Sequence, residues 1–103
     1  MEQLRFVFPG DVPLSGRPTL VGVVSSGNLE VMIEPDDASG ICGIEVATTA
    51  DGFEQVWKAV LEDFTRRHRP ANLRISINDA GATPATVALR LDQALEAFRS
   101  SRK

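Results

Sequence analysis

Hydrophobic and polar residues alternate along much of the chain, with the period of two that is typical of half-buried β-strands. The segment of residues 19–24 is apolar and rich in β-branched residues, which also favours a strand. The pattern therefore predicts strands at residues 4–8, 19–24, 29–34, 42–46 and 73–78. Pro9 ends the first of them and Pro35 ends the third, because proline cannot donate a hydrogen bond to a neighbouring strand.

A period of three to four residues replaces the alternation between residues 51 and 69. Asp51 and Glu54 have the spacing of a capping box, which predicts the start of a helix. The apolar side chains of this helix form one stripe: Phe53, Val56, Trp57, Val60, Leu61 and Phe64. The basic residues 66–69 suit the partial negative charge of a helix C-terminus, and Pro70 ends the helix. We expect Trp57, in the middle of the stripe, to lie in the core.

The segment after residue 82 fits two structures. Thr83 as N-cap and Pro84 at the first helical position favour a helix, with residues 87, 91, 95 and 98 on one face. However, residues 87, 89 and 91 also alternate with polar or small residues, as in a strand. We predict a strand up to about Arg90 and a helix from there to Arg99.

Together these elements predict a single domain over residues 1–103. Its fold class is α+β: a two-layer arrangement with a mainly antiparallel sheet of five or six strands, covered on one face by two helices. A chain of 103 residues is long enough to bury a core without disulfides or metals.

Composition and charge exclude several classes of function. The net charge of -3 gives no electrostatic support for binding nucleic acid. No apolar run approaches the roughly 20 residues of a membrane span, and the N-terminus lacks the pattern of a signal peptide. A single cysteine, Cys42, fits a cytoplasmic protein, and its place on the inward face of a strand predicts a small apolar filler. We expect no membrane or nucleic-acid partner.

The main candidate for a functional residue is Ser26, because another protein could reach its hydroxyl. Gly27 and Asn28 follow it, and such a pair is a signal for a two-residue hairpin turn, because both residues tolerate positive φ. Ser26 would then lie at a tip that another protein can approach, whereas Ser25 would take part in strand pairing. For an arbitrary Ser-Gly pair, the residues alone favour a serine that simply suits a turn.

Two segments around this tip carry a family resemblance. Residues 21–35, V-G-V-V-S-S-G-N-L-E-V-M-I-E-P, resemble the prosthetic-group attachment segment of the acyl carrier (delta) subunit of malonate decarboxylase, and residues 77–84, I-N-D-A-G-A-T-P, resemble the same family. The chain is less similar to the acyl carrier (gamma) subunit of citrate lyase, which stays the alternative. The family more often has Asp after the glycine, where this chain has Asn28.

The resemblance implies a function. It implies that Ser26 carries phosphoribosyl-dephospho-coenzyme A through a phosphodiester, with Gly27 and Asn28 forming the rest of the attachment site. It implies a carrier without catalytic residues or a metal, which works with acyl transferase and decarboxylase subunits and is loaded by a prosthetic-group transferase. We expect these partners to dock around the tip, on flanks that include Asn28, Glu30, Asp79 and Thr83, provided that the second segment lies beside the first.

The remaining candidates favour structural roles. The basic residues 66–69 are interpreted as a solvated helix end, with contact to a cofactor phosphate or an acidic partner as the alternative. The adjacent Asp36 and Asp37 are typical of a turn rather than of a metal site. A hydrolase would need an activated nucleophile, but the sole histidine, His68, has no recognisable spacing to Ser26.

Overall fold

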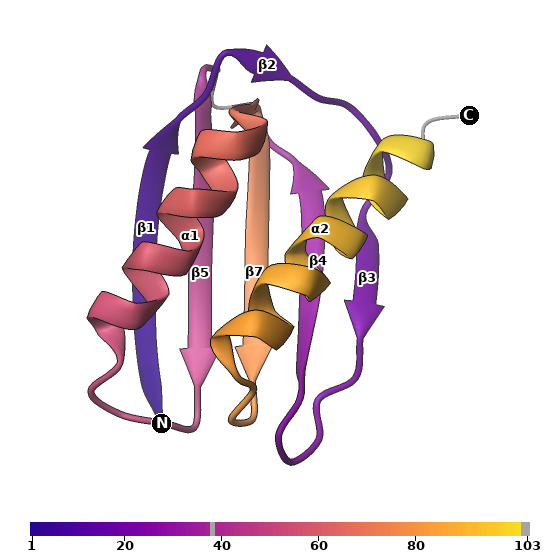
Figure 1. The fold of residues 1–103 in the computed structure, drawn as a ribbon. Helices are drawn as coiled ribbons and strands as arrows, with labels where there is room; N and C mark the ends of the chain where they lie inside the picture. Colours follow the sequence, from indigo (N-terminus) through magenta and orange to yellow (C-terminus); the bar gives the residue numbers. More distant parts are fainter. Residues whose placement is uncertain (38, 102–103) are drawn as a thin grey trace.

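The computed structural model describes residues 1–37 and 39–101 and has two layers, a sheet and a pair of helices packed on one of its faces (Figure 1). In chain order the elements are β1 (Glu2–Pro9), β2 (Val12–Pro13), β3 (Thr19–Gly22), β4 (Leu29–Pro35), β5 (Ile41–Thr48), α1 (Glu54–His68), β6 (Pro70–Ala71), β7 (Leu73–Asp79) and α2 (Pro84–Ser100). The predicted α+β class is confirmed.

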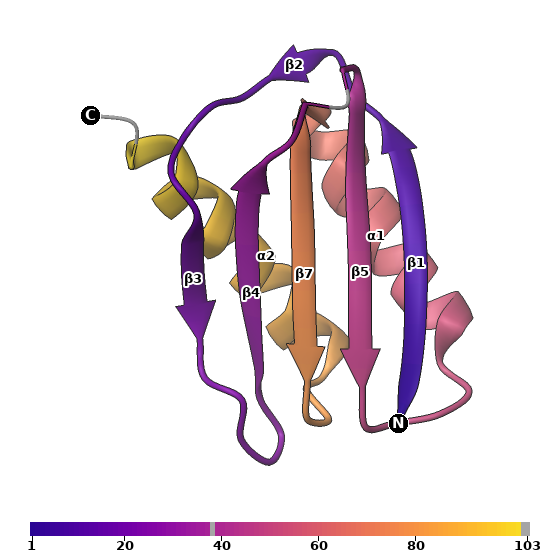
Figure 2. The ribbon, with the colours of Figure 1, turned by 180° about the vertical axis from the view of Figure 1, so that it is seen from behind.

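The main sheet has the strand order β1-β5-β7-β4-β3. Every neighbouring pair is antiparallel except β5 and β7, which are parallel because helix α1 connects them by a crossover. The short strands β2 and β6 pair in parallel as a separate two-stranded sheet. The opposite face of the main sheet is not covered by a helix (Figure 2).

The core lies between the sheet and the helices. It is formed by the inward residues of the three central strands together with one side of each helix: Leu29, Val31, Ile33, Cys42, Ile44, Val46, Trp57, Leu61, Phe64, Leu73, Ile75, Ile77, Val87, Leu91, Ala94, Leu95 and Phe98. The strict alternation of buried and exposed residues in β4, β5 and β7 confirms the predicted strands and their inward faces.

Helix α1 begins later than the capping box predicts. Its N-cap is Phe53, which makes no side-chain cap hydrogen bond. Gly52 has a φ of 84°, so the residue after Asp51 is not helical and Asp51 cannot cap the helix. The apolar stripe is only partly buried, since Phe53 is 50% exposed and Val56 is 41% exposed, whereas Trp57 is buried as predicted.

The prediction of a strand up to Arg90 is wrong, because helix α2 runs without interruption from Pro84 to Ser100. Thr83 is its N-cap and accepts a hydrogen bond from the backbone N–H of Thr86. Leu89, which the strand would have turned inward, is 60% exposed. The helix packs on β3 and β4, as Figure 1 shows.

Candidate functional site

The loop that connects β3 to β4 contains Ser26 at its tip. The backbone N–H of Asn28 donates to the carbonyl oxygen of Ser25 at 2.8 Å, which closes a four-residue turn with Ser26 and Gly27 at its centre. Gly27 has a φ of 76°, a conformation that glycine adopts without steric cost. The loop lies at the lower end of the molecule in Figure 1.

Two details of the predicted hairpin are wrong. Gly27 and Asn28 are not the central pair of the turn, and β3 ends at Gly22 rather than at residue 24. Gly22 has a φ of 99°, and a Cβ there would lie 2.4 Å from the carbonyl oxygen of Leu29. The hydrogen-bonded pairing of β3 with β4 therefore ends at Gly22. Ser25 lies outside the strand and contributes only its carbonyl oxygen to the turn.

The side chain of Ser26 is exposed and makes no hydrogen bond to the residues that the structure describes. Open space surrounds the tip, since a Cβ built on Gly27 would have no atom within 4 Å. The hydroxyl of Ser26 is therefore accessible to another protein. Exposure alone does not distinguish it from Ser25, which is exposed as well.

The turn is attached to a second loop, which connects β7 to α2. The backbone N–H of Gly27 donates to the carbonyl oxygen of Ala80 at 2.7 Å, and the N–H of Ala80 donates to the carbonyl oxygen of Asn28 at 2.8 Å. The two sequence segments that carry the family resemblance are thus neighbours in space. These reciprocal hydrogen bonds hold the base of the tip in one position.

Asp79 fixes the second loop from inside the molecule. Its side chain accepts hydrogen bonds from the hydroxyl of Thr48 at 2.8 Å, from the N–H of Ala82 at 2.9 Å and from the N–H of Gly81 at 3.2 Å. Asp79 is only 6% exposed. It is therefore a structural residue, and the expectation that it offers a docking surface beside the tip is not supported by its position.

Asn28 also contacts helix α2. Its Oδ1 atom accepts a hydrogen bond from Nη2 of Arg90 at 2.9 Å and a second one from the N–H of Leu29 at 2.8 Å. This role of Arg90 was not predicted, because the expected strand placed the residue on its polar side. A helical period would have placed Arg90 beside the inward residues 87 and 91, at the edge of the core.

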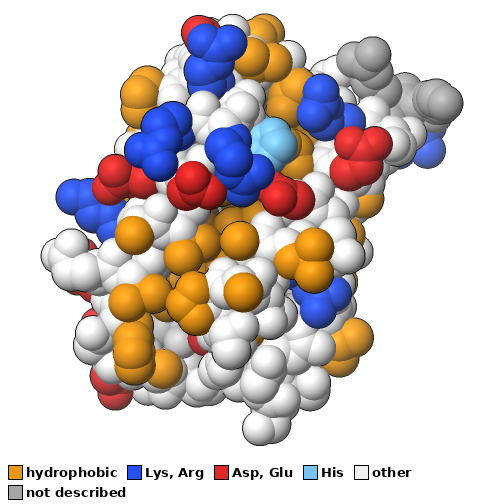
Figure 3. Space-filling view, in the orientation of Figure 1, with side chains coloured by type: hydrophobic (Ala, Val, Ile, Leu, Met, Phe, Trp, Pro, Cys, Tyr) orange, Lys and Arg blue, Asp and Glu red, His pale blue; other side chains and the backbone are white. Residues whose placement is uncertain are grey.

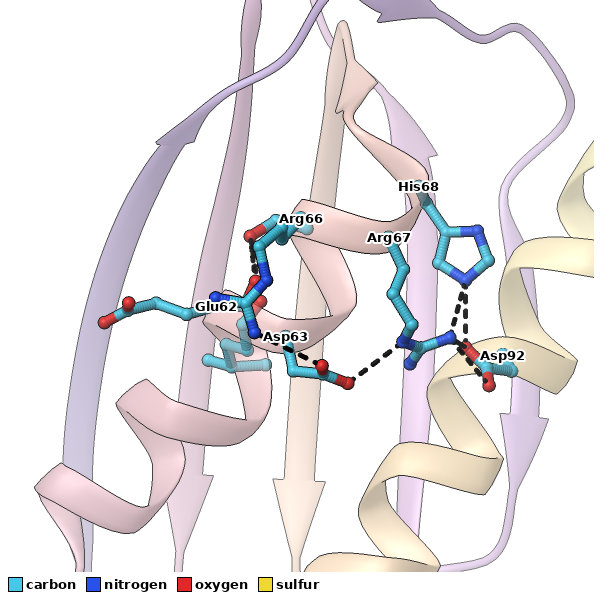
Figure 4. A network of polar contacts seen from close by, with 8 residues as sticks. Glu62, Asp63, Arg66, Arg67, His68 and Asp92 are labelled. Carbon is cyan, nitrogen blue, oxygen red and sulfur yellow. Dashed lines mark hydrogen bonds and ion pairs between the residues drawn. The ribbon is translucent and has the colours of Figure 1, made fainter.

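The basic residues 66–69 lie at the opposite end of the molecule from the tip (Figure 1). Arg66 and Arg67 contact Asp63 at 3.4 and 2.9 Å. Arg67 also contacts Asp92 at 3.3 Å, and Nε2 of His68 lies 3.0 Å from the same carboxylate (Figure 4).

Arg69 forms a separate ion pair with Asp11, at 3.2 Å. The hydrogen bond that Arg67 donates to the carboxylate of Asp63 lowers the pKa of Asp63 and raises the pKa of Arg67. Neighbouring carboxylates thus balance this cluster, as expected for a helix end.

An apolar hollow with a volume of about 240 Å³ lies near the tip, between the N-terminal ends of the two helices. Hydrophobic side chains gather there, below a band of charged ones (Figure 3). Its walls include Phe53, Val56, Trp57 and Val87, and the loop of Asp79 closes one side. Trp57 is therefore a core residue with one edge on this hollow.

Cys42 is fully buried in β5, as predicted, and burial raises the pKa of its thiol to about 12. A thiol with so high a pKa is inert as a nucleophile. Within residues 1–37 and 39–101, no cluster of three or more His, Cys, Asp or Glu side chains has the geometry of a metal site. None of the helices in the same residues is long and apolar enough to cross a membrane.

Comparison with known proteins identifies the family. The model of the family described as "Malonate decarboxylase delta subunit (MdcD)" matches residues 16–98. A malonate decarboxylase acyl carrier protein from Burkholderia cepacia is 55% identical over 95 residues, which cover 91% of this chain and 87% of the relative. The protein of that name from Acinetobacter calcoaceticus is 48% identical over 101 residues, or 96% of this chain and 98% of the relative.

A solved structure agrees with these sequence relatives. A chain in the crystal structure of a Pseudomonas malonate decarboxylase hetero-tetramer in complex with malonate superposes with a TM-score of 0.81 and is 40% identical. The superposition covers 95% of this chain and 99% of that one. Since sequence and fold agree over nearly the whole length, the chain belongs to the malonate decarboxylase delta subunit family, whose curated relatives are named acyl carrier proteins.

Proposed function

We propose that this chain is the acyl carrier subunit of a malonate decarboxylase and that Ser26 is its attachment residue. The prosthetic group would be phosphoribosyl-dephospho-coenzyme A, joined to Oγ of Ser26 by a phosphodiester. The observation that carries the proposal is the tip itself. Its hydroxyl is exposed, makes no hydrogen bond to a described residue, and lies at the centre of a turn that is hydrogen-bonded to a second loop. Gly27 and Asn28 complete the site by shaping that turn.

The surroundings of Ser26 fit a large substituent. The open space at Gly27 leaves room for it, and no hydrogen bond from the Ser26 side chain to a described residue would have to break. The radius of gyration is 12.6 Å, so a domain of this size cannot enclose a long arm, and the arm must extend into active sites on other proteins. When attached, the arm would hold acetyl and malonyl groups as thioesters on its terminal thiol.

The same geometry supports a non-catalytic role. A serine nucleophile needs an adjacent base, but His68 is the last residue of helix α1, and this end of the helix lies opposite the tip (Figure 1). The chain's own residues would present the arm and keep its attachment point fixed. Transfer and decarboxylation would belong to acyl transferase and decarboxylase subunits, and loading would belong to a prosthetic-group transferase.

The comparisons favour malonate over the citrate lyase alternative. The matching family model and the curated relatives are those of malonate decarboxylase, and the similar solved chain is part of a complex crystallised with malonate.

Mass spectrometry tests the attachment residue. The wild type, Ser26→Ala and Ser25→Ala are each co-expressed with the attaching transferase, and their intact masses are compared. We expect wild type and Ser25→Ala to gain the mass of the prosthetic group and Ser26→Ala to gain none, because only Ser26 occupies the centre of the turn. A modified Ser26→Ala protein would show that the assignment is wrong.

A further inference from the structure

Arg90 connects the middle of helix α2 to the tip. Its guanidinium lies against the base of the turn, where Nη2 donates to Oδ1 of Asn28 at 2.9 Å. The same oxygen accepts from the N–H of Leu29 at 2.8 Å, so the orientation of the Asn28 side chain is determined by two donors. The tip is thus held by a side chain from the helical layer in addition to the backbone of the second loop.

The fold leaves room for this arginine. Gly22 has no side chain, and a Cβ there would lie 3.1 Å from Cδ of Arg90 and 3.2 Å from its Nε. The arginine therefore packs against bare backbone at the point where β3 ends. A larger residue at position 22 would displace it.

Stability alone does not explain an arginine in this position. Arg90 is half-buried, and its Nε is buried without a hydrogen-bond partner among the described residues. Arg90 also forms no ion pair with a carboxylate of these residues. Buried donors without a partner are rare, because each loses its hydrogen bond to water. An apolar side chain would avoid this cost, so the guanidinium at this position indicates a role at the tip.

We propose that Arg90 is a positioning residue for the Ser26 tip. By holding Asn28, it restricts the turn to one conformation, so that the attaching transferase meets a pre-formed substrate. The inference rests on the proposed function of Ser26. It goes further by assigning a role to a residue that does not touch the attachment point.

The substitution Arg90→Met distinguishes a positioning role of Arg90 from a role in packing alone. Met keeps an unbranched stem as far as the position of Nε and removes every donor. Arg99→Met is the control, because Arg99 is exposed in the last turn of the same helix. Three quantities are measured for each variant: the melting temperature, the kcat/KM of the transferase for the unmodified protein, and the hydrogen exchange of the backbone amides of Gly27 and Asn28.

We expect Arg90→Met to melt at the wild-type temperature or higher, because it removes the unpaired donor and the unpaired charge. The kcat/KM should fall about tenfold, the equivalent of one lost hydrogen bond to a charged group, and the two amides should exchange faster. Arg90→Lys retains a single charged donor group and should recover part of both effects. Arg99→Met should match the wild type.

A lower melting temperature with unchanged kcat/KM and unchanged exchange would overturn the proposal, since Arg90 would then be a packing residue only. Failure of the proposed function is distinguishable. If the transferase modified the wild type at another residue or not at all, the attachment assignment would be wrong. The amide exchange of Gly27 and Asn28 would still decide whether Arg90 fixes the turn.

Discussion

Asp79 lies at the end of β7, where the chain turns toward helix α2. Its carboxylate accepts three hydrogen bonds, two of them from consecutive backbone N–H groups in the loop that follows. This loop in turn holds the tip through Ala80. A buried carboxylate thus determines the position of an exposed turn that it does not contact.

We expect Asp79→Ala to reduce the free energy of unfolding by about 1.5–3 kcal/mol, because it leaves the N–H groups of Gly81 and Ala82 without their acceptor. Urea denaturation measures the change. Asp51→Ala is a matched control: Asp51 is exposed and does not cap helix α1, so its loss should have little effect. An Asp79→Ala variant as stable as the control would contradict the structural role.

At the scale of elements, the strands were the most predictable part of the fold. In β4, β5 and β7 the alternation is regular because one face of each strand packs on the helices. Helix α2 was harder to predict, since Val87 and Leu91 are four residues apart and satisfy both the period of a strand and that of a helix. The exposure of Leu89 distinguishes the two, and it depends on long-range packing.

The candidate site, like the fold, could be predicted from the sequence only in part. The position of Ser26 at an exposed tip follows from local residue preferences and from the family resemblance. The hydrogen bonds of the tip to Ala80 and Arg90 do not, because they join residues more than fifty positions apart in the sequence. The turn type was also mispredicted: the pair Gly27-Asn28 favours a two-residue hairpin, but the early end of β3 at Gly22 makes the loop longer.

The substitution Trp57→Ala tests the packing of helix α1 on the core. It is 6% exposed and borders the apolar hollow, so its removal would enlarge a space that is already open on one side. We expect Trp57→Ala to lower the free energy of unfolding by about 3 kcal/mol, near the lower limit for a large aromatic residue, because water can enter the enlarged space.

Thermal or urea unfolding measures this change, with Val56→Ala as the control on the same helix. Val56 is 41% exposed, and its truncation should cost less than about 1 kcal/mol. An unchanged stability of Trp57→Ala, together with a loss of carrier function, would instead place Trp57 in a functional surface.

In the whole molecule, the two ends differ in chemical character. The lower end in Figure 1 has the tip, the second loop and the apolar hollow, whereas the upper end has the network of ion pairs around residues 66–69. An arm attached at Ser26 would extend from the lower end. Proteins that act on the arm must therefore approach this end, while the charged network faces away from them.

This arrangement predicts where partner subunits dock. Ser25 is suited to the test because its side chain is exposed and makes no hydrogen bond to described residues, whereas substitution of Asn28 or Asp79 would also disturb the turn or the loop. We expect Ser25→Lys and Ser25→Glu to reduce capture of the partner subunits in a pull-down, because both add a long charged side chain beside the attachment point. Binding should be modest even for the wild type, since a carrier has to leave one active site to reach the next.

Arg66→Glu is the control at the opposite end. The Arg66 side chain is 75% exposed, and among the described residues its only ion pair is a long one with Asp63. The reversal of its charge therefore changes the charged network with little effect on the core. Capture by Arg66→Glu should equal that of the wild type. If Arg66→Glu lost the partners while both Ser25 variants retained them, the docking surface would be the basic helix end, and the arm would have to reach its active sites from the far side of the domain.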